Sequence, residues 1–290
     1  MYKVSKNHVI YSMSPNNEPV LSVPNGSRIE FETCDCFTDQ IVSETEAFQA
    51  LDWDRINPAT GPVYIEGAEA GDVLAVTIEK IETAPTGIAV TGKGMGTLGS
   101  VLEETLVKIF PIDADSVRFN ENITLPLNKM IGVIGTAPKS ETISCGTPDS
   151  HGGNMDCKEI KEGATLYLPV NVPGALLAMG DLHAAMGDGE IGVSGLEVAG
   201  KAIVTVNVIK ENMPLPMIAN PEKIMALASH EDLDAAVDMA VKNMMDHLTN
   251  TTDLSQNEAA MLMSLAADVK ICQVVDPKKT IRVELDRSYL

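Results

Sequence analysis

Apolar and polar positions alternate in short runs along the first 210 residues, with glycine or proline at the joints. The clearest runs are rich in β-branched and aliphatic residues and cover 72–81, 164–172, 175–183 and 202–210. Runs of this kind, bounded by turn residues, predict short strands. Their close spacing predicts a mainly β fold, either sandwich-like or barrel-like.

Two segments of the β part resemble each other. Residues 64–75 (YIEGAEAGDVLA) align with 167–178 (YLPVNVPGALLA), so that tyrosine matches tyrosine and Gly71 matches Gly174. Both segments have the form of a strand, a turn glycine and a second strand. The alignment predicts an internal repeat and therefore two related β halves.

The pattern changes near the C-terminal end. Residues 221–249 carry methionine, leucine, alanine and valine at the spacing of one helix face. A second helix is predicted from Ser255, where the sequence SQNE has the form of a capping box, to Val269. Residues 280–285 (TIRVEL) predict a final strand.

This change of pattern divides the chain into two parts. We expect a β-rich body over residues 1–210, which carries the chemistry, and a small α+β subdomain over 211–290 packed on it. With 290 residues, 44% of them hydrophobic, the chain is long enough to bury one large core or two packed ones.

The charge of the chain limits its partners. Its 41 acidic and 21 basic residues give a net charge of −20 at pH 7. Nucleic-acid binding requires clustered lysine and arginine, so no nucleic-acid partner is expected, whereas metal cations would be attracted. No apolar run approaches the ~20 residues that span a bilayer, and the start lacks the apolar core of a signal peptide, so no membrane partner is expected.

The cysteines indicate the compartment. Five of them are scattered along the chain without a CxxC pair, which is typical of a reduced cytoplasmic protein. Cys34 and Cys36, in FETCDCF, would share one face of a strand and could bind a metal or act as nucleophiles. Buried and inert cysteines are commoner, and this is the interpretation we favour.

The densest group of candidate functional residues is GDLHAAMGDGE at 180–190. If 175–183 is a strand, Asp181 and His183 point to the same face, where a carboxylate and an imidazole can share one divalent metal ion. The Gly-Asp-Gly turn that follows could bring Glu190 back beside them. The alternative is a solvated edge strand followed by an acidic hairpin.

A second glycine-rich segment lies at 146–160 (GTPDSHGGNMDCKEI) and contains His151, Asn154 and Asp156. Paired glycines let the backbone approach a ligand closely, and these side chains could complete a metal site or act as acid and base. A plain surface loop is the alternative. The chain has no G-x-S-x-G elbow and no Walker loop, so a metal-activated water is the better nucleophile for a hydrolase.

Taken in order, the segments GPVYIEGAEAGDVLAVTI, HGGNMD and GDLHAAMGDGEIGVSGLE resemble the acetamidase/formamidase family. The resemblance implies hydrolysis of short aliphatic amides to a carboxylate and ammonia, a largely β fold with a small α+β part, and a homodimer or larger homo-oligomer. The chain is much shorter than the longest formamidases, which leaves substrate choice and assembly size open. The positions that match the motifs of the family are Asp181, His183, Asp188, Glu190, Glu197, His151, Gly152, Gly153, Asn154 and Asp156.

From the residues and the resemblance together we expect a metal centre. Asp181 and His183, with Asp35 or Asp156 as a further ligand, would hold a divalent ion, with zinc the first choice and calcium the second. Such an ion would polarise the carbonyl group of the amide and lower the pKa of its bound water.

The other candidates have roles around this centre. Glu190 would be the general base for the attacking water and would then protonate the leaving ammonia. Asn154 and the backbone N–H groups of Gly152 and Gly153 would hold the oxyanion. The remaining candidates, expected to act as acid or base or to bind the substrate, are His151, Asp188 and Glu197.

Two other functions remain open. One is a thiol amidase that uses Cys145 or Cys157 near His151. The other is a non-enzymatic β module that binds calcium in its acidic loops. A thiol reagent, a chelator and a test of amide turnover would distinguish them.

Overall fold

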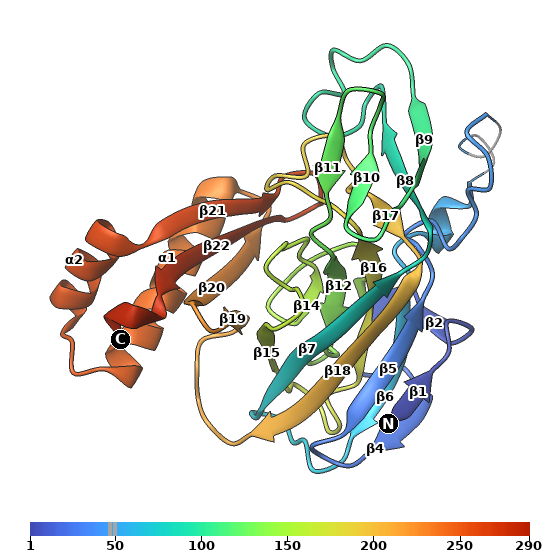
Figure 1. Ribbon diagram of the computed structural model, residues 1–290. Helices are drawn as coiled ribbons and strands as arrows, with labels where there is room; N and C mark the ends of the chain where they lie inside the picture. Colours follow the sequence, from blue (N-terminus) through green and yellow to red (C-terminus); the bar gives the residue numbers. More distant parts are fainter. Residues whose placement is uncertain (46–47, 49–50) are drawn as a thin grey trace.

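The protein is described by a computed structural model that covers residues 1–45, 48 and 51–290. Two large sheets pack against each other and enclose one apolar core (Figure 1). Ile29 and Phe31 of the first sheet meet Ile131, Ile134 and Leu182 of the second in this core. The predicted mainly β, sandwich-like fold with a small C-terminal α+β part is confirmed.

The first sheet has nine strands, mostly antiparallel, with one parallel pair at its N-terminal edge. In spatial order the strands are β1 (Tyr2–Val4), β5 (Arg28–Thr33), β18 (Gly200–Ile209), β7 (Val73–Thr83), β15 (Thr165–Pro169), β19 (Met217–Ala219), β20 (Lys223–His230), β22 (Lys279–Asp286) and β21 (Asp268–Gln273).

The second sheet is branched at strand β16. Its main path is β14 (Gly152–Asn154), β12 (Met130–Gly135), β16 (Leu177–His183), β17 (Glu197–Val198), β8 (Thr86–Thr91) and β9 (Leu106–Pro111). A branch adds β6 (Ala59–Ile65) on β16, and then β2 (Val9–Ile10) and β4 (Leu21–Val23) on β6.

Short elements complete the described part of the chain. They are the pairs β10 (Ser116–Arg118) with β11 (Thr124–Pro126) and β3 (Ser12–Met13) with β13 (Ile143–Ser144), the helices α1 (Leu233–Thr251) and α2 (Gln256–Ala266), and the 3-10 turns η2 (Trp53–Arg55) and η3 (Arg287–Tyr289). Neither described helix is long and apolar enough to cross a membrane.

The two segments that align in the sequence also pair with each other in space. Strand β7 pairs with β15 in the first sheet, and β6 pairs with β16 in the second, both antiparallel. The backbone N–H of Gly71 donates to Val170 O at 2.8 Å, and that of Gly174 donates to Ala68 O at 2.9 Å. This reciprocal pairing supports the two related β halves.

The C-terminal part differs from the prediction at its start. Residues 223–230, expected within a helix, form strand β20, and helix α1 begins only after Asp232, whose side chain accepts from Ala235 N at 2.8 Å. Met225 faces the main core while Ile224 packs beneath the helices. Because both faces of β20 are buried, its sequence lacks the alternation that marks a half-exposed strand.

The second helix follows the prediction more closely. It begins at the expected capping box, in which Ser255 Oγ accepts from Glu258 N and the Glu258 carboxylate accepts from Ser255 N. It ends at Ala266, before the predicted Val269, which instead lies in strand β21.

The C-terminal region is continuous with the first sheet, because β19 pairs with β15. It also has an apolar cluster of its own, in which Met244 and Leu248 of α1 and Met263 of α2 cover β20 and β22 (Figure 1). This separate cluster supports a boundary near residue 210, which we retain as a proposal.

Candidate active site

A cavity of about 170 Å³ lies at the ends of three strands of the second sheet. Asn154 of β14, Asp181 of β16 and Glu197 of β17 face it. The other residues that line the cavity are Cys36, Phe37, Phe48, Trp53, Ile56, Asn57, Val90, Met95, Glu190, Val193, Ser194 and Asp276.

His183 lies at the centre of a buried group of carboxylates. Its Nε2 atom is 3.2 Å from Glu197 Oε2, 3.4 Å from Asp181 Oδ1 and 3.6 Å from Asp156 Oδ1. All four side chains are at most 3% exposed. The prediction that Asp181 and His183 point the same way is confirmed by their contact.

The second sheet explains why these groups meet. His183 and Glu197 are direct partners across the β16–β17 pair, so their side chains lie on the same face. Gly132 of β12 leaves space for the carboxylates, since a Cβ atom there would lie 2.4 Å from Asp156 Oδ1 and 2.6 Å from Asp181 Oδ2.

Three of the carboxylate residues have an unusual backbone. The φ angles of Asp156, Asp181 and Glu190 are 41°, 55° and 46°. Residues other than glycine rarely adopt this region. Backbone strain of this kind persists where the surrounding structure enforces it, and it concentrates at functional sites. The turn after Gly189 brings Glu190 within 4.8 Å of ligand atoms of Asp156 and His183, as the sequence suggested.

The atoms that face one another here lack hydrogen-bond partners. Among the described residues this holds for His183 Nε2, Asp156 Oδ1, Asp181 Oδ1 and Glu197 Oε2, all of them buried. One Nε2–H can point at only one of the three oxygens around it, and unpaired buried polar atoms are costly. A cation bound among these residues would satisfy the atoms that it contacts, so the residues fit a metal ion.

The separations support this fit. Ligand atoms held about 2.0–2.1 Å from a tetrahedral zinc ion lie about 3.4 Å from one another. The three distances from His183 Nε2, 3.2–3.6 Å, lie around this value. The mixture of nitrogen and carboxylate ligands is also typical of zinc, whereas calcium takes oxygen ligands only.

The ionisation of these groups is strongly coupled. Burial, followed by the charge of Asp181, raises the pKa of Asp156 to about 7, and burial raises that of Glu197 to about 8. Burial lowers the pKa of His183, but the charges of Glu197 and Asp181 outweigh it and hold that pKa well above its usual value. The repulsion between the carboxylates is what a divalent cation would relieve.

Cys36, and not the neighbouring Asp35 expected from the sequence, is a candidate metal ligand. Its thiol forms a group with Asp181 and Glu197 in which the ligand atoms are within 4.8 Å of one another. The second candidate ligand group of the described residues consists of Asp156, His183 and Glu190, and Asp35 belongs to neither group. Its Oδ1 accepts instead from the N–H groups of Phe37 at 2.9 Å and Asp39 at 2.8 Å, which closes a turn.

In the glycine-rich segment 146–160, one residue lines the cavity and the paired glycines make backbone contacts beside it. Asn154 lines the cavity and is 4% exposed, and its Oδ1 has no described partner. The N–H of Gly152 donates to Asp149 O at 3.0 Å and is therefore occupied. Gly153 fits tightly, because a Cβ atom there would lie 2.5 Å from Thr147 O.

His151 is buried, but it is not among the described residues that line the small cavity. Neither of its ring nitrogens has a hydrogen-bond partner among the described residues. Burial lowers its pKa to about 4, so the ring is neutral at pH 7. A role for His151 as acid or base stays a prediction.

Asp188, expected to bind the substrate, is held by cations. Arg282 contacts it through Nη1 at 2.7 Å, and Lys158 Nζ lies 2.9 Å from it. It lines a second, larger cavity, of about 590 Å³, next to the first.

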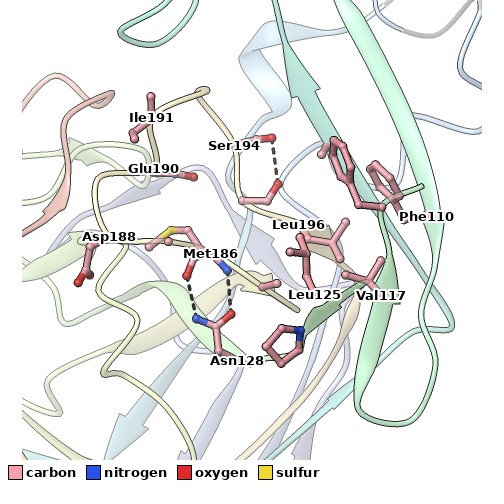
Figure 2. A pocket seen from close by; sticks show the side chains of 16 residues that line it. Phe110, Val117, Leu125, Asn128, Met186, Asp188, Glu190, Ile191, Ser194 and Leu196 are labelled. Carbon is pink, nitrogen blue, oxygen red and sulfur yellow. Dashed lines mark hydrogen bonds between the residues drawn. The ribbon is translucent and has the colours of Figure 1, made fainter. Parts of the chain in front are cut away.

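This larger cavity is mainly apolar. Figure 2 shows Phe110, Val117 and Leu196 gathered at one end and the two acidic side chains, Asp188 and Glu190, at the other. The cavities share Glu190 and Ser194, so the loop that carries them separates the two. The candidate ligands Asp181, Glu197 and Cys36 line the smaller cavity, which we therefore take as the site of the chemistry.

The cysteines of the rival thiol mechanism are inaccessible. Cys145 and Cys157 are both 0% exposed. Burial raises the pKa of Cys145 to about 12, and its Sγ donates to Ile10 O at 3.6 Å. Neither is among the described residues that line the small cavity.

Sequence reasoning missed one residue of the site entirely. Asp276 lines the small cavity, and burial together with the charge of Asp156 raises its pKa well above the usual value. It lies in the turn between β21 and β22, far along the chain from the other site residues. The only signal was the Asp-Pro pair in this turn, which is too common to indicate a site.

Solved structures of other proteins share this fold. An acetamidase from Bacillus halodurans has a TM-score of 0.97 and 49% sequence identity, with 99% of this chain and 98% of that chain covered. A predicted acetamidase/formamidase from the thermophile Thermoanaerobacter tengcongensis has a TM-score of 0.97 and 50% identity, with 100% of this chain and 96% of that chain covered.

Curated relatives are longer and more distant. The acetamidase of Mycolicibacterium smegmatis is 27% identical, with 69% of this chain and 65% of that protein covered. The chain spans 62% to 65% of the length of the curated relatives it matches. Residues 4–145 and 140–285 match the Acetamidase/Formamidase family, and the chain therefore belongs to that family.

Proposed function

We propose that the protein is a metal-dependent amidase that hydrolyses short aliphatic amides to a carboxylate and ammonia. The observation that carries this proposal is the group of four buried, unpartnered ligand atoms, His183 Nε2 and the three carboxylate oxygens around it, of which those of Asp181 and Glu197 belong to residues that line the small cavity. Family membership supports the amide as the substrate, since relatives are named acetamidase and formamidase.

The proposed metal ligands are His183 with Asp156, Asp181 and Glu197, and Cys36 lies close enough to be a further one. Zinc is the proposed ion, because nitrogen and sulfur ligands accompany the carboxylates. A divalent ion of this kind supplies a Lewis acid that polarises a carbonyl group and lowers the pKa of water from ~16 toward 7.

The chain's own residues provide the proton transfers. Glu190 faces the cavity and would accept a proton from the water that attacks the carbonyl carbon. As the C–N bond breaks, Glu190 would return this proton to the nitrogen, so that ammonia leaves. The amide group of Asn154 is placed to donate to the negative charge that develops on the carbonyl oxygen.

The size of the cavity supports a small substrate. Its volume of about 170 Å³ is below the range of about 300–1,000 Å³ that is usual for drug-sized ligands. Apolar side chains such as Phe37, Ile56 and Val90 also line the cavity and would contact the alkyl group of the amide. The homo-oligomer implied by the family and the cytoplasmic location stay predictions.

Ammonia release tests the proposal. Formamide, acetamide and propionamide are given to the purified protein before chelation, after chelation and after zinc is added back. We expect activity that is lost on chelation and restored by zinc. No ammonia from any amide, with the fold intact and metal bound, would contradict the proposed function.

A further inference from the structure

Asp276 reaches the small cavity from the C-terminal region, in the turn that connects β21 and β22. Its Oδ2 atom is buried and has no hydrogen-bond partner among the described residues. It belongs to neither of the two candidate ligand groups. The neighbouring carboxylate of Asp156, when ionised, can itself only accept hydrogen bonds, so the acceptor that Asp276 presents to the cavity is left for a donor from a ligand.

The turn that carries Asp276 is rigidly built. The Oε1 atom of Gln273 accepts from the N–H groups of Val275 at 2.9 Å and Asp276 at 3.0 Å. The Nε2 atom of the same side chain donates to Lys278 O at 2.7 Å. Gln273 is 0% exposed, so these bonds are shielded from water and fix the position of Asp276.

The same turn is attached to the loop that carries Glu190. Gly189 N donates to Cys272 O at 2.9 Å, and Val274 N donates to Gly189 O at 3.2 Å. Lys278, in the same turn as Asp276, forms an ion pair with Asp149. Asp276 and Glu190 are thus held in a fixed relation on one wall of the cavity.

The chemistry of an amide identifies what this acceptor can bind. A primary amide presents a carbonyl oxygen, which accepts hydrogen bonds, and an NH2 group, which donates two. Asn154 can serve the oxygen, because its side chain is 4% exposed and faces the cavity. In a site shielded from water the NH2 group needs an acceptor too, since an unpaired donor is costly.

We propose that Asp276 is a substrate-positioning residue that accepts hydrogen bonds from the NH2 group of the amide and so selects primary amides over N-alkyl amides and esters. The inference rests on the proposed amide hydrolysis. It gives the C-terminal region a direct part in the site. A site built to bind a donor discriminates strongly against analogues that lack it.

The test compares Asp276→Asn with Asp268→Asn in the metal-loaded protein. Asp268 has a 66% exposed side chain in strand β21, so its substitution removes the same charge from the same hairpin away from the cavity. The kcat and KM values are measured for acetamide, N-methylacetamide and methyl acetate, together with metal content and melting temperature.

We expect Asp276→Asn to lower kcat/KM for acetamide by about 10- to 100-fold, the loss expected for a hydrogen bond to a charged group. The kcat/KM for methyl acetate, which has no N–H, stays within about 2-fold of wild type, and the preference for acetamide over N-methylacetamide falls. Metal content and melting temperature stay unchanged, and Asp268→Asn behaves like wild type.

Equal losses on acetamide and methyl acetate, or a loss of metal, would overturn the inference, because Asp276 would then be a structural residue or a ligand. If Asp276→Asn does not fold, Asp276→Glu, which keeps the charge but moves it by one methylene, must lower the ratio of amide to ester turnover. An unchanged ratio in that variant overturns the inference as well. Failure of the wild-type protein to hydrolyse any amide would instead contradict the proposed function.

Discussion

Arg282 donates two hydrogen bonds to the carboxylate of Asp188, from Nη1 to Oδ1 at 2.7 Å and from Nη2 to Oδ2 at 2.9 Å. Its Nε also donates to Glu284 Oε1 at 2.7 Å. The pair joins strand β22 of the C-terminal region to the loop that carries Glu190. Asp188 therefore has a structural partner, which explains why its carboxylate is not available in the small cavity.

We expect Arg282→Met to lower the free energy of unfolding by about 2 kcal/mol, because Glu284, which is 4% exposed, and the partly exposed Asp188 would each lose the charged hydrogen bonds of the guanidinium and keep only a lysine as partner. Urea denaturation measures this change. Arg287→Met, which removes an exposed arginine nearby, serves as the control. A loss below about 1 kcal/mol would show that the pair contributes little, as exposed ion pairs do.

Gly132→Ala should remove metal binding, and because the added Cβ atom would also lie 2.9 Å from Asp181 O, the melting temperature is measured to verify that the chain folds. The added Cβ atom would lie 2.4 Å from Asp156 Oδ1 and 2.6 Å from Asp181 Oδ2, so the carboxylates must move apart. Gly187→Ala is the matched control, because a Cβ atom there has no described neighbour within 4 Å. Zinc titration by calorimetry compares the two. Equal zinc affinity in both variants would contradict the proposed ligand positions.

Glu190→Gln should lower kcat for acetamide by about 10²- to 10⁴-fold, the usual contribution of a general base. Zinc content should be retained, since His183 keeps three other carboxylate oxygens at 3.2–3.6 Å. Glu104→Gln, at an exposed position, should leave kcat unchanged. Steady-state kinetics and metal analysis of both variants provide the measurement, and a kcat near wild type would exclude Glu190 as the base.

The contribution of His151 to the stability of the protein should fall as the pH drops below about 6.5. Burial lowers the pKa of His151 from 6.5 to about 4, so between these values the unfolded chain binds a proton that the folded chain does not. This difference removes about 2 kcal/mol between pH 7 and pH 5. The stability that His151 contributes is thus present above pH 6.5 and is lost toward pH 4.

Urea unfolding of wild type and His151→Leu at pH 7 and pH 5 tests this expectation. Leucine cannot take up the proton, and the substitution breaks no described side-chain hydrogen bond, since both ring nitrogens lack partners. The variant should lose about 2 kcal/mol less than wild type between the two pH values. Identical pH dependence in the two proteins would show that His151 does not titrate in this way.

Much of the β body could be predicted because its runs of β-branched and aliphatic residues are short and are bounded by glycine or proline. Alternation in β16 placed Asp181 and His183 together, and the glycine turn indicated the return of Glu190. Strand β20 was missed because both of its faces are buried, which removes the alternation that distinguishes a strand from a helix.

The remaining site residues depend on contacts that sequence patterns do not contain. Strand β5 ends at Thr33, and the turn that follows, with Thr38 and Asp39 at φ 57° and 55°, brings Cys36 to the site in place of Asp35. Asp276 arrives from a hairpin of the C-terminal region, and the hydrogen bonds of Gln273 together with the tertiary contacts at Gly189 set its position.

The most direct test of the metal amidase is the zinc content per chain of His183→Ala, measured together with its release of ammonia from acetamide. His8→Ala, at an exposed position, is the control. We predict about one zinc ion per chain and full turnover in wild type and His8→Ala, and the loss of both in folded His183→Ala. Full zinc content and turnover in His183→Ala would contradict the account, because the atom at the centre of the proposed ligand group would then be dispensable.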